Sequence, residues 1–173
     1  EAKLRQLDLP CVICAVGSID EKSSDVCSSV HVDDIRESYR IVDYLCKAGH
    51  QRIAVFVATR EDKSISAQRL EGYRRALADN GLPVCEELIR YSNAGENIYS
   101  MERGYRDMKE LLRERDDFTA IYAISDTMAM GICRALKEAG KSVPDDYSVV
   151  GFDGLDMASY YIPTITTMKQ PVR

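Results

Sequence analysis

The sequence predicts an α/β fold built on a doubly wound, mainly parallel sheet. Patterns typical of strands and of helices alternate along the 173 residues and are separated by short joints. One strand-like run, residues 52–58, is apolar throughout instead of alternating, which is typical of a strand covered on both faces. We therefore expect βα units joined by right-handed crossovers around one parallel sheet.

The first two thirds of the chain contain three candidate strands and three candidate helices. The helices show apolar residues at helical spacing and end at glycines or turn residues. In order, these are a strand at 12–16, a Ser-rich turn-like stretch at 17–29, a helix opened by Asp33 and Asp34 and closed by Gly49, a strand at 52–58, a helix from Ser66 to Gly81, a strand at 87–91 and a helix at 101–112.

The last third repeats the pattern with sharper boundaries. We expect Asp126 to be the N-cap of a helix that Gly140 ends, because its carboxylate can accept backbone N–H bonds. The predicted elements are a strand at 118–124, this helix to Ala139, a strand at 147–150 that stops at Gly151, a short helix at 155–160 and a strand at 165–168.

Composition excludes several classes of function. The formal net charge is −5 and no Lys/Arg cluster appears, so this segment is not expected to hold DNA itself. No apolar run approaches the roughly 20 residues of a membrane span. The opening residues lack the apolar stretch of a signal peptide. We expect a cytoplasmic protein that has no membrane partner.

Cysteine and histidine usage argues against a metal, a cofactor or an enzyme. Cys11 and Cys14 form the only C-x-x-C, inside a predicted strand that turns them to opposite faces, and no second pair completes a zinc set. The six cysteines are therefore predicted to be small apolar filler in a reducing compartment. Of the two histidines, His50 is expected to bond backbone carbonyls. G-x-G-x-x-G and P-loop motifs are missing, and Ser or Cys catalysis lacks a histidine partner.

Ligands of a doubly wound sheet gather outside the carboxyl ends of its strands. That rule selects four places, at residues 59–69, 92–99, 125–126 and 152–154. It predicts where a ligand binds and leaves its chemistry open.

Four segments resemble the LacI/GalR family of bacterial transcription regulators. They occur in the family's order over about 140 residues, which is more specific than any single motif. The segments are 45–54 with Gly-His-Gln-Arg-Ile-Ala, 68–77 with Arg-Leu-Glu-Gly-Tyr, 120–131 with Ser-Asp-Thr-Met-Ala-Met-Gly, and 143–171 with Ser-Val-Val-Gly-Phe-Asp followed by Pro-Thr-Ile-Thr-Thr-Met-Lys-Gln-Pro.

The resemblance implies one lobe of a type I periplasmic-binding-protein-like sensor. Residues 1–30 would be the tail end of the N-terminal lobe, 31–168 the C-terminal lobe and 169–173 the start of a crossover segment. Such a domain binds a small effector, a sugar or a nucleoside, between two lobes and couples it to DNA held by a helix-turn-helix headpiece absent from this chain. The alternative is a periplasmic sugar-binding protein of a transporter; free-looking cysteines argue against it.

The resemblance also implies four ligand-binding residues. Arg69 matches a ligand-contacting arginine, although a salt bridge to Glu71 or Asp62 is the alternative. Asp153 matches a carboxylate that accepts hydroxyl donors, or is only the first residue of an Asp-Gly turn. Ser125 replaces an asparagine common in the family and leaves only a hydroxyl. Tyr99 matches an aromatic that stacks on ligands, or is an ordinary packing tyrosine.

A homodimer is predicted on the helix at 127–139. Met128, Gly131 and Ala135 form a second apolar stripe on that helix, and a helix with two apolar sides is normally buried on both. Relatives pair through this helix and the segment after Gly-Phe-Asp. The predicted interface adds three nearby residues, Met157, Tyr160 and Tyr161. The alternative is that the stripe packs beneath the helix at 155–160 of the same chain.

Overall fold

The computed structural model describes residues 12–14, 28–58, 60, 65–92 and 97–171. Its main body is a five-stranded sheet in the order β4-β3-β5-β6-β7, and every neighbouring pair is parallel. The strands are β3 (Ile53–Val57), β4 (Ile89–Tyr91), β5 (Ala120–Ala123), β6 (Ser148–Asp153) and β7 (Thr166–Lys169). The predicted doubly wound parallel α/β fold is confirmed.

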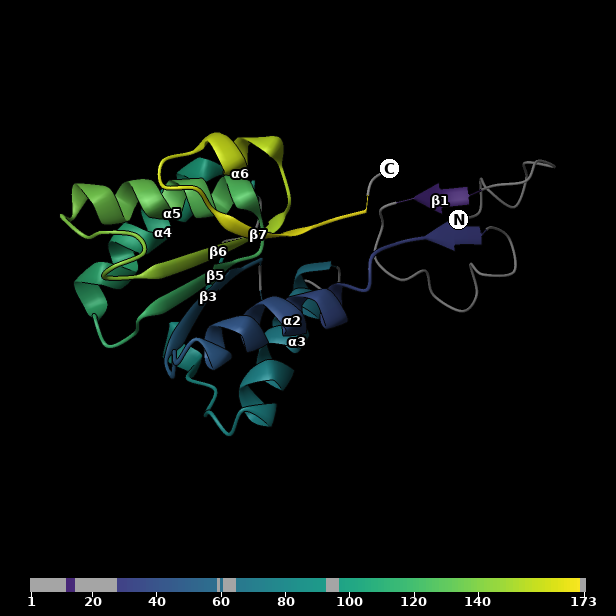
Figure 1. Ribbon diagram of the computed structural model, residues 1–173, viewed down its shortest axis with the longest axis horizontal. Helices are drawn as coiled ribbons and strands as arrows, with labels where there is room; N and C mark the ends of the chain where they lie inside the picture. Colours follow the sequence, from purple (N-terminus) through teal and green to yellow (C-terminus); the bar gives the residue numbers. More distant parts are fainter. Residues whose placement is uncertain (1–11, 15–27, 59, 61–64, 93–96, 172–173) are drawn as a thin grey trace.

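Helices cover both faces of this sheet (Figure 1). One layer contains α2 (Asp34–Lys47) and α3 (Ile65–Asp79), which pack on each other, and the other contains α4 (Met101–Glu114) and α5 (Asp126–Glu138). A short 3-10 helix, η2 (Glu86–Leu88), precedes β4, and α6 (Asp156–Tyr160) lies beside α5. The sheet is thus buried on both sides, as its apolar strands require.

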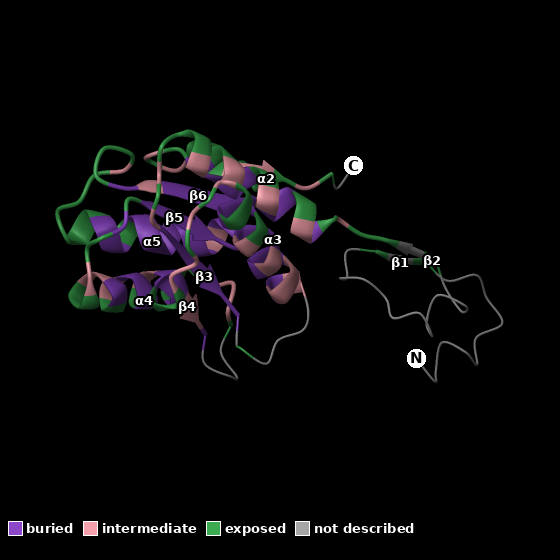
Figure 2. Ribbon diagram, turned by 90° about the horizontal axis from the view of Figure 1, so that it is seen from below, coloured by how far each residue is buried: buried purple, intermediate pink, exposed green. Residues whose placement is uncertain are grey.

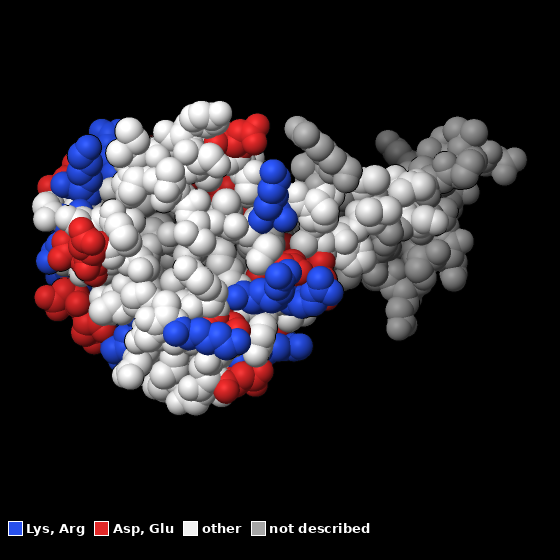
Figure 3. Space-filling view, viewed as in Figure 1, with Lys and Arg blue, Asp and Glu red and all other residues white. Residues whose placement is uncertain are grey.

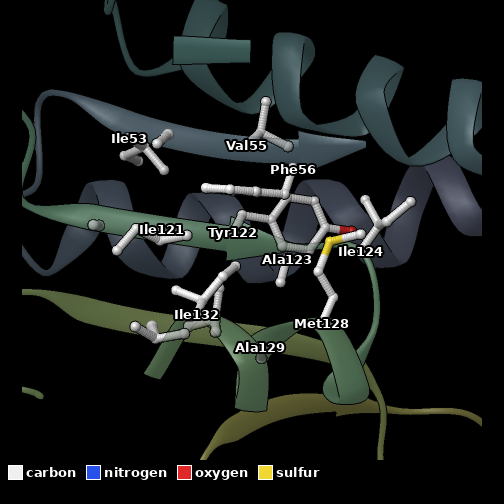
Figure 4. Close-up of a cluster of buried hydrophobic side chains, with 14 of the residues drawn as sticks. Ile53, Val55, Phe56, Ile121, Tyr122, Ala123, Ile124, Met128, Ala129 and Ile132 are labelled. Carbon is white, nitrogen blue, oxygen red and sulfur yellow. The ribbon is translucent and has the colours of Figure 1, made fainter. Parts of the chain in front are cut away.

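The core fills the space between the sheet and each helical layer. Figure 4 shows buried apolar side chains of β3 and β5, such as Phe56 and Ile121, together with Met128 and Ile132 of α5. All five residues of β3 and all four of β5 are buried, whereas α2, α3 and α4 each have an outer side that is exposed or half-buried, and α5 is buried over most of its length (Figure 2). The Tyr122 hydroxyl bonds the Ser38 hydroxyl of α2 at 2.7 Å, so this buried polar group has a partner in the helical layer that it faces.

A separate two-stranded parallel sheet pairs β1 (Val12–Cys14) with β2 (Ser28–Val30). β2 overlaps the stretch predicted to be turn-like. Its serines do not indicate a strand by themselves, and its pairing with β1 is not visible in the local sequence. The chain that follows β7 runs from the five-stranded sheet toward this pair (Figure 1). The predicted division at residues 30 and 168 stays a prediction.

Several expectations need correction. Strand β6 continues through Asp153 instead of stopping at Gly151, since Val150 to Asp153 pair with β7. The His50 ring bonds two hydroxyls, of Thr119 and Ser148, rather than backbone carbonyls. Of the cysteines, Cys133 is buried but Cys14 is exposed, and Cys11 lies outside the described residues. Within the described part, no helix is long and apolar enough to cross a bilayer.

Candidate functional site

The strand order places a topological switch between β3 and β5. The chain leaves β3 for its neighbour β4 on one side, and leaves β5 for its neighbour β6 on the other. The crossovers therefore separate onto opposite faces, and a crevice forms outside the carboxyl ends of these two strands. Three of the predicted site residues, Arg69, Ser125 and Asp153, lie at this edge of the sheet.

Arg69 is buried at the centre of this edge, with 4% of its surface exposed. Its Nε donates to Asp34 Oδ1 of α2 at 2.8 Å, and a terminal N–H donates to the Ile124 carbonyl at the end of β5. The guanidinium carbon lies 3.7 Å from the centre of the Phe152 ring of β6. Arg69 thus joins α2, α3, β5 and β6, and protein groups use most of its donors.

Of the two alternative partners predicted for Arg69, Glu71 is not one that it uses. Glu71 pairs with Arg75 on the surface of α3, and Asp62 lies outside the described residues. Asp34 was taken only as part of a helix start, because no local pattern connects it to an arginine 35 positions away. It is the acidic residue at this edge that sequence reasoning missed.

Asp153 is the charged group that extends from this network toward solvent. Its Oδ1 lies 3.5 Å from Arg69 Nη1 and accepts a 2.7 Å hydrogen bond from Gln170 Nε2, yet 26% of the side chain stays exposed. Burial raises the pKa of the Asp153 carboxyl, and the Arg69 charge opposes that rise. Asp153 therefore has one side held by protein partners and another open to a ligand.

A hollow of about 760 Å³ opens beside Asp153 at the carboxyl ends of β6 and β7. Its walls offer carboxylate acceptors, an ammonium group and an amide, which are hydrogen-bonding groups suited to hydroxyls. The lining residues are Asp153, Gly154, Leu155, Asp156, Lys169, Gln170 and Pro171. Among these lining residues, Gln170 donates a hydrogen bond to the Asp153 carboxylate.

The N-cap of α5 is Ser125, not Asp126 as predicted, and the predicted ligand contact of Ser125 stays a prediction. Ser125 is the N-cap of α5, since its hydroxyl accepts from the Met128 N–H at 3.2 Å, and it is almost fully buried. Asp126 is the first residue of the helix, and its Oδ2 accepts from the Leu155 N–H at 2.7 Å. Two adjacent residues that can both cap a helix leave the choice to tertiary contacts.

Tyr99 lies just before α4 and is partly buried against the core. Its carbonyl accepts a hydrogen bond from the Thr127 hydroxyl at the start of α5. These contacts connect Tyr99 to the Ser125 end of the site. Its ring packs on the protein, as the alternative interpretation held, and its predicted role in stacking on a ligand stays a prediction.

The predicted dimer stripe is wrong in part. Met128, Gly131 and Ala135 are buried inside the chain against α4, and a Cβ on Gly131 would come within 1.9 Å of the Met101 carbonyl. The crossover from β4 to β5 brings α4 onto the face that α5 also covers, which the sequence pattern did not reveal. Met157 and Tyr160 are exposed, at 54% and 86%, and the Tyr161 hydroxyl donates to the Met130 carbonyl.

The architecture is a parallel sheet covered by helices on both faces, with a hollow at its carboxyl edge. Residues 42–173 match the family model described as a periplasmic binding protein-like domain. The chain belongs to that family. The resemblance to LacI-type regulators expected from the sequence is also confirmed by the relatives described next.

The HTH-type transcriptional regulator MalR of Clostridium butyricum is 37% identical over 171 residues, which cover 99% of this chain and 49% of the relative. A LacI-family sugar-binding transcriptional regulator from Escherichia coli, solved with phosphate, superposes with a TM-score of 0.83 at 31% identity, covering 99% of this chain and 58% of that one. A LacI-family regulator from Enterococcus faecium with bound ribose has a TM-score of 0.77 at 31% identity, covering 94% and 56%.

The chain spans about half the length of the curated relatives it matches. These relatives are named as transcriptional regulators rather than enzymes.

Proposed function

We propose that this chain senses a small effector for a bacterial transcription regulator. The effector is a sugar or a nucleoside-like molecule that binds between this lobe and a second one, to which β1 and β2 would belong. The observation that carries the proposal is Asp153, which is held by Arg69 and Gln170 at the carboxyl end of β6 and still faces an open hollow.

A carboxylate with this geometry suits a ligand rich in hydroxyl groups. Its held oxygen is fixed by two donors, so the remaining acceptor capacity is preorganised at little cost in side-chain entropy on binding. The ribose in the related regulator from Enterococcus faecium is such a ligand. The relatives' names support a cytoplasmic regulator over a periplasmic sugar-binding protein of a transporter, and neither reading requires a cofactor or catalysis.

DNA binding is assigned to a headpiece outside this chain. Basic and acidic side chains are intermixed on the face of the described residues shown in Figure 3, so this face offers no continuous basic surface for a duplex. Effector binding would then change operator affinity through a movement of the lobes, which requires a ligand that binds one arrangement more tightly than the other.

The test is a thermal-shift screen of sugars and nucleosides on the full-length protein, followed by calorimetry on Asp153→Ala. Losing a charged hydrogen-bond partner should weaken binding by about 1.5–3 kcal/mol, or roughly 10- to 150-fold. Glu71→Ala is the matched control, because Glu71 pairs with Arg75 on the surface of the same lobe. Equal affinity in wild type and Asp153→Ala would contradict the site.

The homodimer is proposed on α6 rather than on the buried stripe of α5. The apolar residues Leu155, Met157, Tyr160 and Ile162 are exposed around this short helix. Large apolar side chains clustered on a surface are typical of interface cores. Light scattering of this fragment should give twice its 19.5 kDa mass, and Tyr160→Glu should halve the observed mass while the helical circular-dichroism signal stays. A wild-type fragment that remains monomeric would remove the case for this surface.

A further inference from the structure

The buried carboxylate of Asp126 has no role in the site described so far. Its residue is completely buried at the start of α5, and its Oδ2 accepts a 2.7 Å hydrogen bond from the Leu155 N–H. Among the described residues, no hydrogen-bond partner reaches its Oδ1. That atom lies against β6 at Gly151, where a Cβ would come within 2.3 Å of it. Only glycine at position 151 leaves room for the carboxylate.

Asp126 thus reaches across β6 to the turn that follows the strand. In this turn Asp153 has a φ of 122° and Gly154 a φ of 73°. A positive φ on a residue with a Cβ costs of the order of 1–3 kcal/mol and persists only where neighbouring contacts enforce it. The conformation that aims Asp153 at the hollow therefore depends on bonds made by the turn.

Few side chains make those bonds. The Gly154 N–H donates to the Thr167 hydroxyl at 3.2 Å, and Gln170 bonds both the carboxylate and the carbonyl of Asp153. The third anchor is Asp126, on the Leu155 N–H. Thr167 and Gln170 lie on or directly after β7, whereas Asp126 belongs to α5, so Asp126 is the anchor that connects the turn to the helical layer.

We propose that Asp126 is a positioning residue that holds the turn of residues 153–155, so that Asp153 and α6 move as one unit. Asp153 begins this turn and lines the hollow, while Leu155 ends it and leads directly into α6 with its exposed apolar residues. The part of the proposal that concerns effector affinity rests on the proposed function of Asp153.

The cost of burying this carboxylate supports a role of this kind. Isolated buried carboxylates are destabilising, and helix starts are satisfied equally well by groups that stay near solvent. Burial raises the pKa of Asp126, and the nearby Thr167 hydroxyl and the N–H groups of Leu155 and Gly154 act in the opposite direction. An apolar side chain of similar size would avoid this cost but would leave the Leu155 N–H without its acceptor.

The test uses Asp126→Ala, Asp126→Asn and the control Ile132→Ala in the full-length protein. Asparagine keeps an acceptor for Leu155, whereas alanine removes it. Ile132 is completely buried six residues further along the same helix and lies beside Ile121 in the core (Figure 4), so its truncation is expected to lower stability alone. Hydrogen exchange of the amides of residues 154–160 and calorimetry with D-ribose, maltose and cellobiose are the two measurements.

We expect faster exchange of residues 154–160 in Asp126→Ala and at least tenfold weaker binding of the sugar that wild type binds. Asp126→Asn should restore both, and Ile132→Ala should lower the melting temperature and change neither. If Asp126→Ala fails to fold, Gly151→Ala serves instead, because its Cβ displaces the carboxylate.

Unchanged exchange in Asp126→Ala would overturn the proposal, as would faster exchange with unaltered affinity. If wild type binds none of the three sugars, it is the sugar assignment in the proposed function that fails. The exchange comparison then still decides whether Asp126 holds the turn.

Discussion

Several charged side chains at the carboxyl ends of the five strands, called here the carboxyl edge, are buried, whereas those at the amino ends, the amino edge, are exposed. At the carboxyl edge, Arg69, Asp34 and Asp126 are almost completely removed from water. At the amino edge, Arg52 bonds Asp117 with both side chains well exposed, and the His50 ring bridges two hydroxyls. Both edges belong to the same parallel strands, so the difference does not arise from the fold class.

The contrast concerns what each group of charges costs and contributes. Buried charges cost desolvation energy that their attraction offsets only in good geometry, so a cluster of them indicates a role beyond folding. Exposed ion pairs contribute little to the free energy of folding and keep most of their hydration, so they cost little desolvation energy. The buried charges, which cost desolvation energy, lie at the same edge as the hollow, in agreement with a binding site there.

The largest effect is expected at the carboxyl edge, from Asp34→Ala. Removing this partner leaves the Arg69 charge buried with only the more distant Asp153 carboxylate, so the free energy of unfolding should fall by about 3 kcal/mol. Urea unfolding measures the change. Lys47→Ala on the same helix breaks an exposed pair with Asp43 and should cost below about 1 kcal/mol. Similar losses in the two variants would erase the contrast between the edges.

A smaller effect is expected at the amino edge, from Arg52→Ala. The Arg52 and Asp117 side chains are 39% and 48% exposed, so their pair should contribute about 0–1 kcal/mol and less at high salt. The measurement is urea unfolding of both proteins at low and high sodium chloride. A loss as large as that of Asp34→Ala would show that exposure does not decide the value of these pairs.

The smallest effect concerns pH and His50. Burial lowers the pKa of its ring below 6.5, so the unfolded chain binds this proton more readily than the folded one. The stability contributed by the neutral ring is thus present above pH 6.5 and is lost as the pH falls through the folded pKa. His50→Gln should flatten that part of the stability curve. An unchanged slope between pH 7 and 5, measured by urea unfolding at each pH, would contradict this assignment.

Periodicity predicted most of the fold because each element is specified by nearby residues. The apolar run of β3 and the repeat of α5 were placed within a few residues of their observed bounds. Pairing between distant segments was not visible in the same way. Nothing local connects Arg69 to Asp34, and nothing local shows that α4 covers Gly131.

The sequence predicted where the candidate site lies better than it predicted which of its residues remain accessible. Arg69, Ser125 and Asp153 all lie at the predicted edge, yet Arg69 and Ser125 are buried and bonded within the protein. A motif records which residues occupy an edge and not which of them remain accessible. Burial follows from how helices pack above the sheet, and this depends on contacts across the whole chain.

The contact between α4 and α5 has a mechanical consequence. A Cβ on Gly104 would come within 2.2 Å of the Met128 carbonyl, and one on Gly131 within 1.9 Å of the Met101 carbonyl, so each helix backbone lies in a notch of the other. Two helices seated this closely cannot slide along or rotate past each other without a collision of main-chain atoms. We therefore expect the two helices to move together as one rigid unit relative to the sheet. A displacement of the start of α5 would then displace α4 by a similar amount.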